Sequence, residues 1–162
     1  MLPYVRIFQA LREAGVRYLV AGGVAVNLHQ VVRATVDLDL ILHLEEKNIL
    51  KFVRVMKDLG YTPRVPVAAE DLADPKKRRQ WIEEKNMMVF SFIRPDNPME
   101  IVDVFVKEPM RFASLDKRRA DVEAFGLKIP VVGVADLIRI KRKAGRERDL
   151  YDISLLSKKR TP

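Results

Sequence analysis

Residues 18–44 read YLVAGGVAVNLHQVVRATVDLDLILHL, and the hydrophobic pattern changes twice along them. A short β-rich run at residues 17–21 leads into a glycine pair, and Val24 to Gln30 is predicted to be a helix. From Thr35 to Leu44, every second residue is apolar, a period of two that is typical of a strand. The segment therefore predicts a strand, a helix and a second strand in close succession.

The second predicted strand carries two acidic residues, Asp37 and Asp39. Both fall on one face, about 6.6 Å apart at about 3.3 Å per residue. Ionised carboxylates at this spacing repel each other, and a divalent cation between them would neutralise the repulsion. The alternative is an exposed strand edge with two ordinary aspartates. The apolar residues from Val36 to Leu42, which we expect in the core, disfavour that alternative.

A third acidic residue, Asp103, stands alone in the apolar run from Ile101 to Val106. A buried aspartate without a partner is costly. If this run forms a strand beside the one with Asp37 and Asp39, three carboxylates converge on a site for one or two Mg²⁺ ions, or Mn²⁺. The alternative for Asp103 is a salt bridge to a nearby arginine.

The composition agrees with oxygen ligands for any metal. The chain has 162 residues, no cysteine and only two histidines, which excludes disulfides, zinc–thiolate sites and thiol nucleophiles. A site built from carboxylates favours a hard cation such as Mg²⁺.

The formal net charge is +8, which suits either solubility alone or a polyanionic partner. Clustering favours a polyphosphate or RNA partner, because nine basic residues lie between Leu137 and Arg160 against three acidic ones. The basic residues are Arg139, Lys141, Arg142, Lys143, Arg146, Arg148, Lys158, Lys159 and Arg160.

The other elements follow from periodicity. We predict helices at residues 3–14, 45–59, 134–144 and 147–156, a helical turn at 76–85, a loop at 61–75, and strands at 87–93, 100–106 and 127–132. The order predicts a single domain over residues 1–162 of α/β (α+β) class. A small mixed sheet would be flanked by helices, with a C-terminal helical pair at about 134–158.

The chain has neither the apolar segment of a signal peptide nor a run of about 20 apolar residues that could span a bilayer. We therefore expect a cytoplasmic protein with no membrane partner.

The glycine pair Gly22-Gly23, the pair Asp37-Leu-Asp39 and the separate Asp103 resemble the DNA polymerase beta superfamily of nucleotidyltransferases. The run Ala21–His29 with Arg33, Thr35 and residues 37–40 resembles more narrowly the bacterial minimal nucleotidyltransferases, including enzymes of toxin–antitoxin and abortive-infection systems. The resemblance implies the nucleotidyltransferase fold. It also implies Asp37, Asp39 and Asp103 as Mg²⁺ ligands, Asp103 as candidate general base, and Gly22 and Gly23 as contacts of the triphosphate.

The C-terminal segment also resembles the toxin-like branch, which places a lysine and a nearby aspartate at the active site. Lys141 would contact a phosphate oxygen and Asp149 would orient it. The alternative is a solvated amphipathic helix, on which Arg142 or Lys143 could take the role of Lys141. Arg33 would either meet phosphate or pair with Asp37.

Two functions follow as expectations. The first is a Mg²⁺-dependent enzyme that transfers a nucleoside monophosphate from an NTP to a hydroxyl of RNA or protein and releases pyrophosphate. The second is a non-catalytic nucleotide- or RNA-binding regulator, or a toxin–antitoxin component of the same fold. A cognate antitoxin or another partner protein is a further expected partner.

Overall fold

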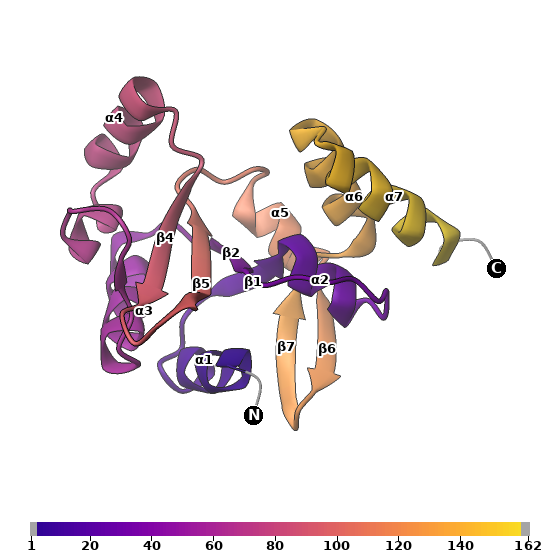
Figure 1. Ribbon diagram of the computed structural model, residues 1–162, viewed down its shortest axis with the longest axis horizontal. Helices are drawn as coiled ribbons and strands as arrows, with labels where there is room; N and C mark the ends of the chain where they lie inside the picture. Colours follow the sequence, from indigo (N-terminus) through magenta and orange to yellow (C-terminus); the bar gives the residue numbers. More distant parts are fainter. Residues whose placement is uncertain (1–2, 160–162) are drawn as a thin grey trace.

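A mixed β-sheet forms the centre of the computed structural model, which describes residues 3–159 (Figure 1). The seven strands of the described chain lie in the order β3-β4-β5-β2-β1-β7-β6. Their bounds are β1 Tyr18–Ala21, β2 Leu38–Leu42, β3 Thr62–Pro63, β4 Val89–Arg94, β5 Asn97–Phe105, β6 Ala120–Ala124 and β7 Leu127–Val131. Strand β2 pairs antiparallel with β1 and parallel with β5, so it lies in the interior of the sheet.

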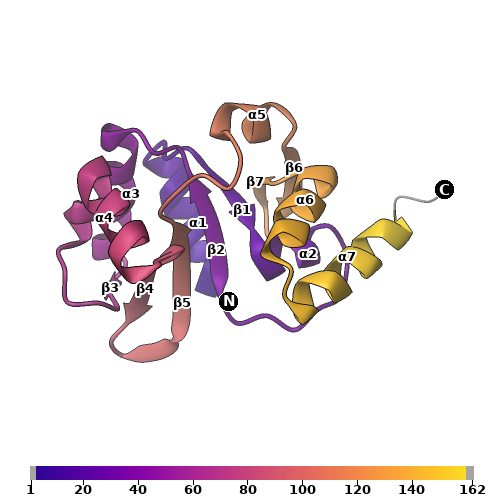
Figure 2. The same cartoon turned by 90° about the horizontal axis from the view of Figure 1, so that it is seen from above.

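Helices cover both faces of the sheet. Their bounds are α1 Pro3–Glu13, α2 Gly22–Leu28, α3 Glu46–Asp58, α4 Pro75–Lys85, α5 Phe112–Lys117, α6 Val134–Ala144 and α7 Glu147–Lys159, with a 3₁₀ helix at Ala69–Ala73. Seen from above, α3 and α4 lie on one side of the β4–β5–β2 part of the sheet, and α6 and α7 lie on the other (Figure 2). Over residues 3–159, no helix has the length and apolar character needed to cross a membrane.

The core lies where β2 meets α3. Leu38, Leu40, Ile41 and Leu42 of β2 are fully buried, and α3 adds an apolar face that includes Phe52. Phe52 packs edge-to-face against Phe92 of β4, with ring centroids 5.5 Å apart. This packing fixes β2 in the middle of the molecule, where its charged residues need a reason to be present.

The predicted helices are present, and residues 76–85 form all but the first residue of the full helix α4. Asp74 caps α4 by accepting a hydrogen bond from the backbone N–H of Lys76 at 2.8 Å, and Pro75 takes the first helical position. The predicted hairpin is also confirmed, because β4 and β5 pair antiparallel.

Three expectations were wrong in detail. The strand predicted from Thr35 begins only at Leu38, the first residue of β2. Its partner β1 ends at Ala21, which pairs with Asp39, so no β1 residue is left to pair with residues 35–37. Val36 is consequently 54% exposed rather than part of the core, and Asp37 immediately precedes the strand. Residues 61–75, expected to be a loop, contain β3 and the 3₁₀ helix. The prediction also missed α5 and β6. Strand β6 is a short edge strand in which Ala120, Val122 and Ala124 alternate with Asp121 and Glu123.

Candidate active site

The three predicted metal ligands lie near one another at the centre of the sheet. In the parallel ladder between β2 and β5, Asp39 lies directly beside Asp103, and on its other side Asp39 lies beside Ala21 of β1. Asp37 precedes β2 by one residue. We call Asp37, Asp39 and Asp103 the carboxylate cluster. The alternative of an exposed strand edge is wrong, since β2 has a strand on each side.

The acids of the carboxylate cluster repel one another. Burial, then the charges of Asp103 and Asp37, raise the pKa of Asp39 to about 6. Burial also raises the pKa of Asp103. A hydrogen bond from Ser91 opposes this rise, the charge of Asp37 adds to it, and the charge of Arg64 opposes it. The cluster therefore carries more negative charge than its surroundings neutralise.

No basic side chain closes on the carboxylate cluster. Among residues 3–159, none of the ion pairs within 4.0 Å involves its three acids, so the structure does not contain the alternative salt bridge from Asp103 to an arginine. Carboxylate oxygens suit Mg²⁺ or Mn²⁺. The shortage of positive charge and the type of donor therefore both fit a divalent cation.

The three carboxylates are not arranged around a common metal position. Within the described part of the chain, no three acidic, histidine or cysteine side chains stand in an arrangement that would hold a metal ion. Ser91 lies directly opposite Asp103 on β4 and donates from Oγ to Asp103 Oδ1 at 2.5 Å, and Asp39 rests against Gly22. To share an ion, the carboxylates must turn toward one another from these positions.

The glycine pair at the start of α2 makes room for two side chains of the site. Gly22 has a φ of +60°, and a Cβ at this residue would lie 1.8 Å from Asp39 Oδ2. A Cβ at Gly23 would lie 2.0 Å from Nη1 of Arg33. Any larger residue at either position would displace a predicted site residue. The predicted contact of both glycines with a triphosphate stays a prediction.

A second charged group lies on the C-terminal helices. Lys141 Nζ lies 2.9 Å from Asp152 Oδ2 and 3.7 Å from Asp149 Oδ1, and the Lys141 side chain is only 6% exposed. Arg33 Nε lies 2.8 Å from Asp152 Oδ1, in an ion pair that is not aligned as a hydrogen bond. Arg146 Nε donates to Asp149 Oδ2 at 2.6 Å. We call these five residues the ion-pair network.

The contacts of the ion-pair network show that two of the alternatives considered from the sequence are wrong. Lys141 is not on a solvated helix face, because it is buried between two carboxylates of α7. Arg33 does not pair with Asp37, because it is engaged by Asp152. The nearest partner of Lys141 is Asp152 rather than the predicted Asp149, which is held more closely by Arg146.

The ion-pair network borders the carboxylate cluster. The charges of Lys141 and Arg146 both lower the pKa of Asp39, against the larger effects that raise it. The eight predicted site residues thus lie in one region: Asp37, Asp39, Asp103, Gly22, Gly23, Arg33, Lys141 and Asp149.

Sequence reasoning missed Ser91, Arg64, Arg146 and Asp152. The spacing of Asp149 and Asp152 on one helical face was a usable signal for Asp152. Nothing comparable pointed to Ser91, because the β4–β5 register shifts by a bulge between Ile93 and Arg94.

The rest of the C-terminal basic segment is mostly on the surface. Arg142, Lys143 and Arg148 are exposed. Arg160, counted above among the nine basic residues, lies outside the described residues.

By sequence, the chain matches no protein-family model and no protein of curated function. By structure it is similar to several solved proteins. The candidate nucleotidyltransferase TM1012 from Thermotoga maritima aligns over 99% of this chain and 97% of its own, with 16% identity and a TM-score of 0.59. The lincosamide antibiotic adenylyltransferase LnuA aligns over 94% and 93%, with 14% identity and a TM-score of 0.63.

The antibiotic-resistance factor ANT(2″)-Ia aligns over 96% of this chain and 80% of its own, with 12% identity and a TM-score of 0.63. The chain has the nucleotidyltransferase fold. The expected architecture of a small mixed sheet between helices is therefore confirmed. At these identities the nucleotidyltransferase fold is what the proteins share, and the chemistry must be argued from the site itself.

Proposed function

We propose that the protein is a divalent-metal-dependent nucleotidyltransferase that moves a nucleoside monophosphate from an NTP to an acceptor hydroxyl. The observation that carries the proposal is the pairing of Asp39 with Asp103 at the centre of the sheet, with Asp37 close by and no neutralising cation within 4.0 Å among the described residues. Three partly buried acids side by side raise the free energy of the folded protein, and a bound divalent cation would offset that repulsion.

The carboxylates of Asp37, Asp39 and Asp103 would hold Mg²⁺ or Mn²⁺. The bound ion would neutralise charge on the triphosphate and lower the pKa of the acceptor hydroxyl. Asp103 is the proposed base. Its pKa is raised, and Ser91 engages only Oδ1, which leaves Oδ2 to accept the hydroxyl proton.

The acceptor oxygen forms a bond to the α-phosphorus while its proton passes to Asp103. The bond from the α-phosphorus to the oxygen that bridges to the β-phosphorus breaks, and pyrophosphate leaves. Positioning and electrostatics carry the rate, because no covalent enzyme intermediate forms.

Arg33 is the proposed phosphate contact of the site. Its guanidinium lies against Gly23 and its side chain is 18% exposed, so it retains access to a ligand at the glycine pair. Lys141 is far less exposed. We assign Lys141 a supporting role, because it pairs with Asp152, which in turn holds Arg33, and Asp149 is the second partner of Lys141. The predicted direct contact of Lys141 with phosphate would require Lys141 to leave these buried partners.

For the acceptor, exposed Arg142, Lys143 and Arg148 favour a polyanion such as RNA over an uncharged molecule. A protein acceptor, or a cognate antitoxin that blocks the site, is also part of the proposal. Two of the structural neighbours are described as acting on small molecules: LnuA on a lincosamide antibiotic, and ANT(2″)-Ia in a complex with adenylyl-2″-tobramycin. The acceptor panel should therefore include an aminoglycoside and a lincosamide beside RNA and lysate protein.

The test is a label-transfer assay. Each NTP, labelled at the α- or the γ-phosphate, is incubated with Mg²⁺ and the acceptor panel. We expect transfer of the α-label only, with loss of transfer in Asp39→Asn and normal transfer in the control Asp58→Asn, an exposed acid on α3. Transfer of the γ-label would make the protein a kinase. Binding of Mg²⁺–NTP without transfer to any acceptor would favour the non-catalytic regulator.

A further inference from the structure

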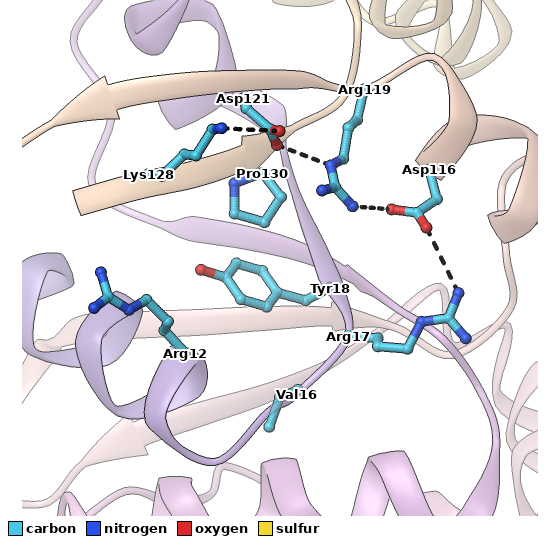
Figure 3. Close-up of a pocket in the computed structure, with 9 residues that line it drawn as sticks. All are labelled: Arg12, Val16, Arg17, Tyr18, Asp116, Arg119, Asp121, Lys128 and Pro130. Carbon is cyan, nitrogen blue, oxygen red and sulfur yellow. Dashed lines mark hydrogen bonds and ion pairs between the residues drawn. The ribbon is translucent and has the colours of Figure 1, made fainter.

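A cavity of about 340 Å³ lies at the opposite end of β1 from the carboxylate cluster (Figure 3). Tyr18 begins β1 and lines the cavity, whereas Ala21 ends β1 beside Asp39. Along the strand the two ends are about 10 Å apart, at about 3.3 Å per residue. The cavity is lined by residues of α1, β1, α5, β6 and β7 and contains none of the predicted site residues.

The cavity has an excess of positive charge. Four basic residues line it, Arg12, Arg17, Arg119 and Lys128, against two acidic ones, Asp116 and Asp121. The acids hold Arg119 most closely, at 2.7 Å and 2.8 Å. Their contacts with Arg17 and Lys128 are longer, at 3.5 Å and 3.9 Å.

Two hydrogen-bond donors in the cavity have no partner within the described chain. Tyr18 is 6% exposed, and its hydroxyl makes no hydrogen bond to residues 3–159 while it points between Arg12 and Lys128 (Figure 3). Burial raises the pKa of Tyr18, so the hydroxyl keeps its proton and can donate it. The guanidinium of Arg12 makes no ion pair or hydrogen bond with any described residue. A hydroxyl and a guanidinium that face one cavity without a protein partner are groups to which an anion can bind.

We propose that this cavity binds a small phosphate monoester, at a site separate from the carboxylate cluster. The excess of two positive charges in its lining matches a phosphate dianion, and guanidinium groups bind phosphate oxygens in a bidentate way. The volume lies near the lower end of the range for ligand pockets, about 300–1,000 Å³. That volume suits a molecule of the size of a sugar phosphate.

The test is calorimetry with ribose 5-phosphate and ribose, both in EDTA, so that no metal can bring phosphate to the carboxylate cluster. We expect one ribose 5-phosphate to bind per chain with a Kd below about 1 mM, and ribose to bind at least about tenfold more weakly. Equal affinity for the two sugars, or no binding of either, would overturn the proposal.

Variants locate the bound phosphate. Arg12→Gln should weaken binding by about tenfold, and Tyr18→Phe by about threefold, because Phe keeps the ring that stacks on Phe8 and removes only the hydroxyl. Arg54→Gln, the same charge change at an exposed residue of α3, is the control and should stay within about twofold. If Arg12→Gln and Tyr18→Phe bind as wild type does, the phosphate binds elsewhere. The assay uses neither metal nor NTP, so its outcome is independent of the proposed transferase activity.

Discussion

The carboxylate cluster and the ion-pair network lie side by side but differ in how their charges are balanced. The network sets three cations against two acids, and its members contact one another at distances down to 2.6 Å. The cluster sets three acids against no cation within 4.0 Å in the described chain. The network is thus neutralised from within the protein, whereas the cluster needs something from outside.

This difference separates two roles that look alike in a sequence. A buried pair of opposite charges costs desolvation, but it orients the elements that carry it. A buried group of like charges costs stability in the free protein, and that cost is recovered when a cation binds. The network should therefore matter most for folding, and the cluster most for chemistry.

The largest effect should come from breaking the network at Asp152. Asp152→Ala removes the partner of both Lys141 and Arg33 and leaves one buried and one partly buried cation poorly paired. We expect a loss of about 3–5 kcal/mol in the free energy of unfolding, measured by urea denaturation. The matched control Glu147→Ala, an exposed acid on the same helix, should cost less than about 1 kcal/mol. Similar losses in the two variants would show that the network does not hold α6 and α7 in place.

The next largest effect concerns chemistry at the cluster. Asp103→Asn keeps the size of the side chain but removes the proposed base and one metal charge. We expect NTP binding to be retained and α-label transfer to fall by at least about a hundredfold. Calorimetry with NTP and the label-transfer assay measure the two quantities. Full transfer activity in this variant would refute the role of Asp103, whereas lost NTP binding would point to a ligand-binding role instead.

The third effect is a gain of stability, and it depends on pH. The pKa of Asp39 in the folded state is about 6, above its ordinary value of 3.8, so the folded protein is stabilised when Asp39 is protonated. That stability is present below about pH 4 and is lost as pH rises through 6. We therefore expect Asp39→Asn, without metal, to be more stable than wild type by about 1–2 kcal/mol above pH 7.

The difference between Asp39→Asn and wild type should vanish near pH 4, and denaturation at several pH values in EDTA measures it. Mg²⁺ or Mn²⁺ should then stabilise wild type and leave Asp39→Asn nearly unchanged. Equal stabilisation of the two proteins by the metal would refute the assignment of the metal site. A variant that is less stable than wild type at every pH would show that the carboxylate of Asp39 is a structural partner.

The smallest effect should come from Ser91, which positions Asp103 by a hydrogen bond. Ser91→Ala should lower kcat by about three- to tenfold with little change in KM for NTP, because only the orientation of the base is affected. Ser91→Thr keeps the hydroxyl and should restore kcat. Ser114→Ala on α5 serves as the control. A parallel rise in KM, or no rescue by threonine, would mean that Ser91 acts through general packing.

The amount that sequence could predict differs between the two regions. Alternating apolar residues predicted β2 and an apolar run predicted β5. The isolated acids predicted the cluster, because a charge in an apolar strand is conspicuous. The sequence predicted that the three acids converge only if the strand with Asp103 lies beside the strand with Asp39. The structure pairs these two strands, β5 and β2. Whether residues 1–162 form one domain, as we predicted, is a separate question that denaturation can address.

The network was far less predictable. Lys141 and Asp149 came from a resemblance, and the strongest partner, Asp152, went unassigned although its side chain is fully buried. A charged residue on a helix usually faces water, so its burial depends on how two helices pack against a distant loop. That packing brings Arg33 to α7 from more than a hundred residues away in the chain, a contact that no local pattern encodes.

The position of β5 in the chain also has a consequence for folding during synthesis. Strand β2 is made early, but its neighbour β5 is made much later, after α3, α4 and β4. Until β5 arrives, β2 would present an unpaired edge with the apolar side chains of Leu38 and Leu40, a surface that invites aggregation. Contacts between distant segments also form slowly. On the ribosome, the chain should therefore depend on α1, α3 or a chaperone to shield that edge. The carboxylate cluster should assemble only after β5 has been made and paired with β2.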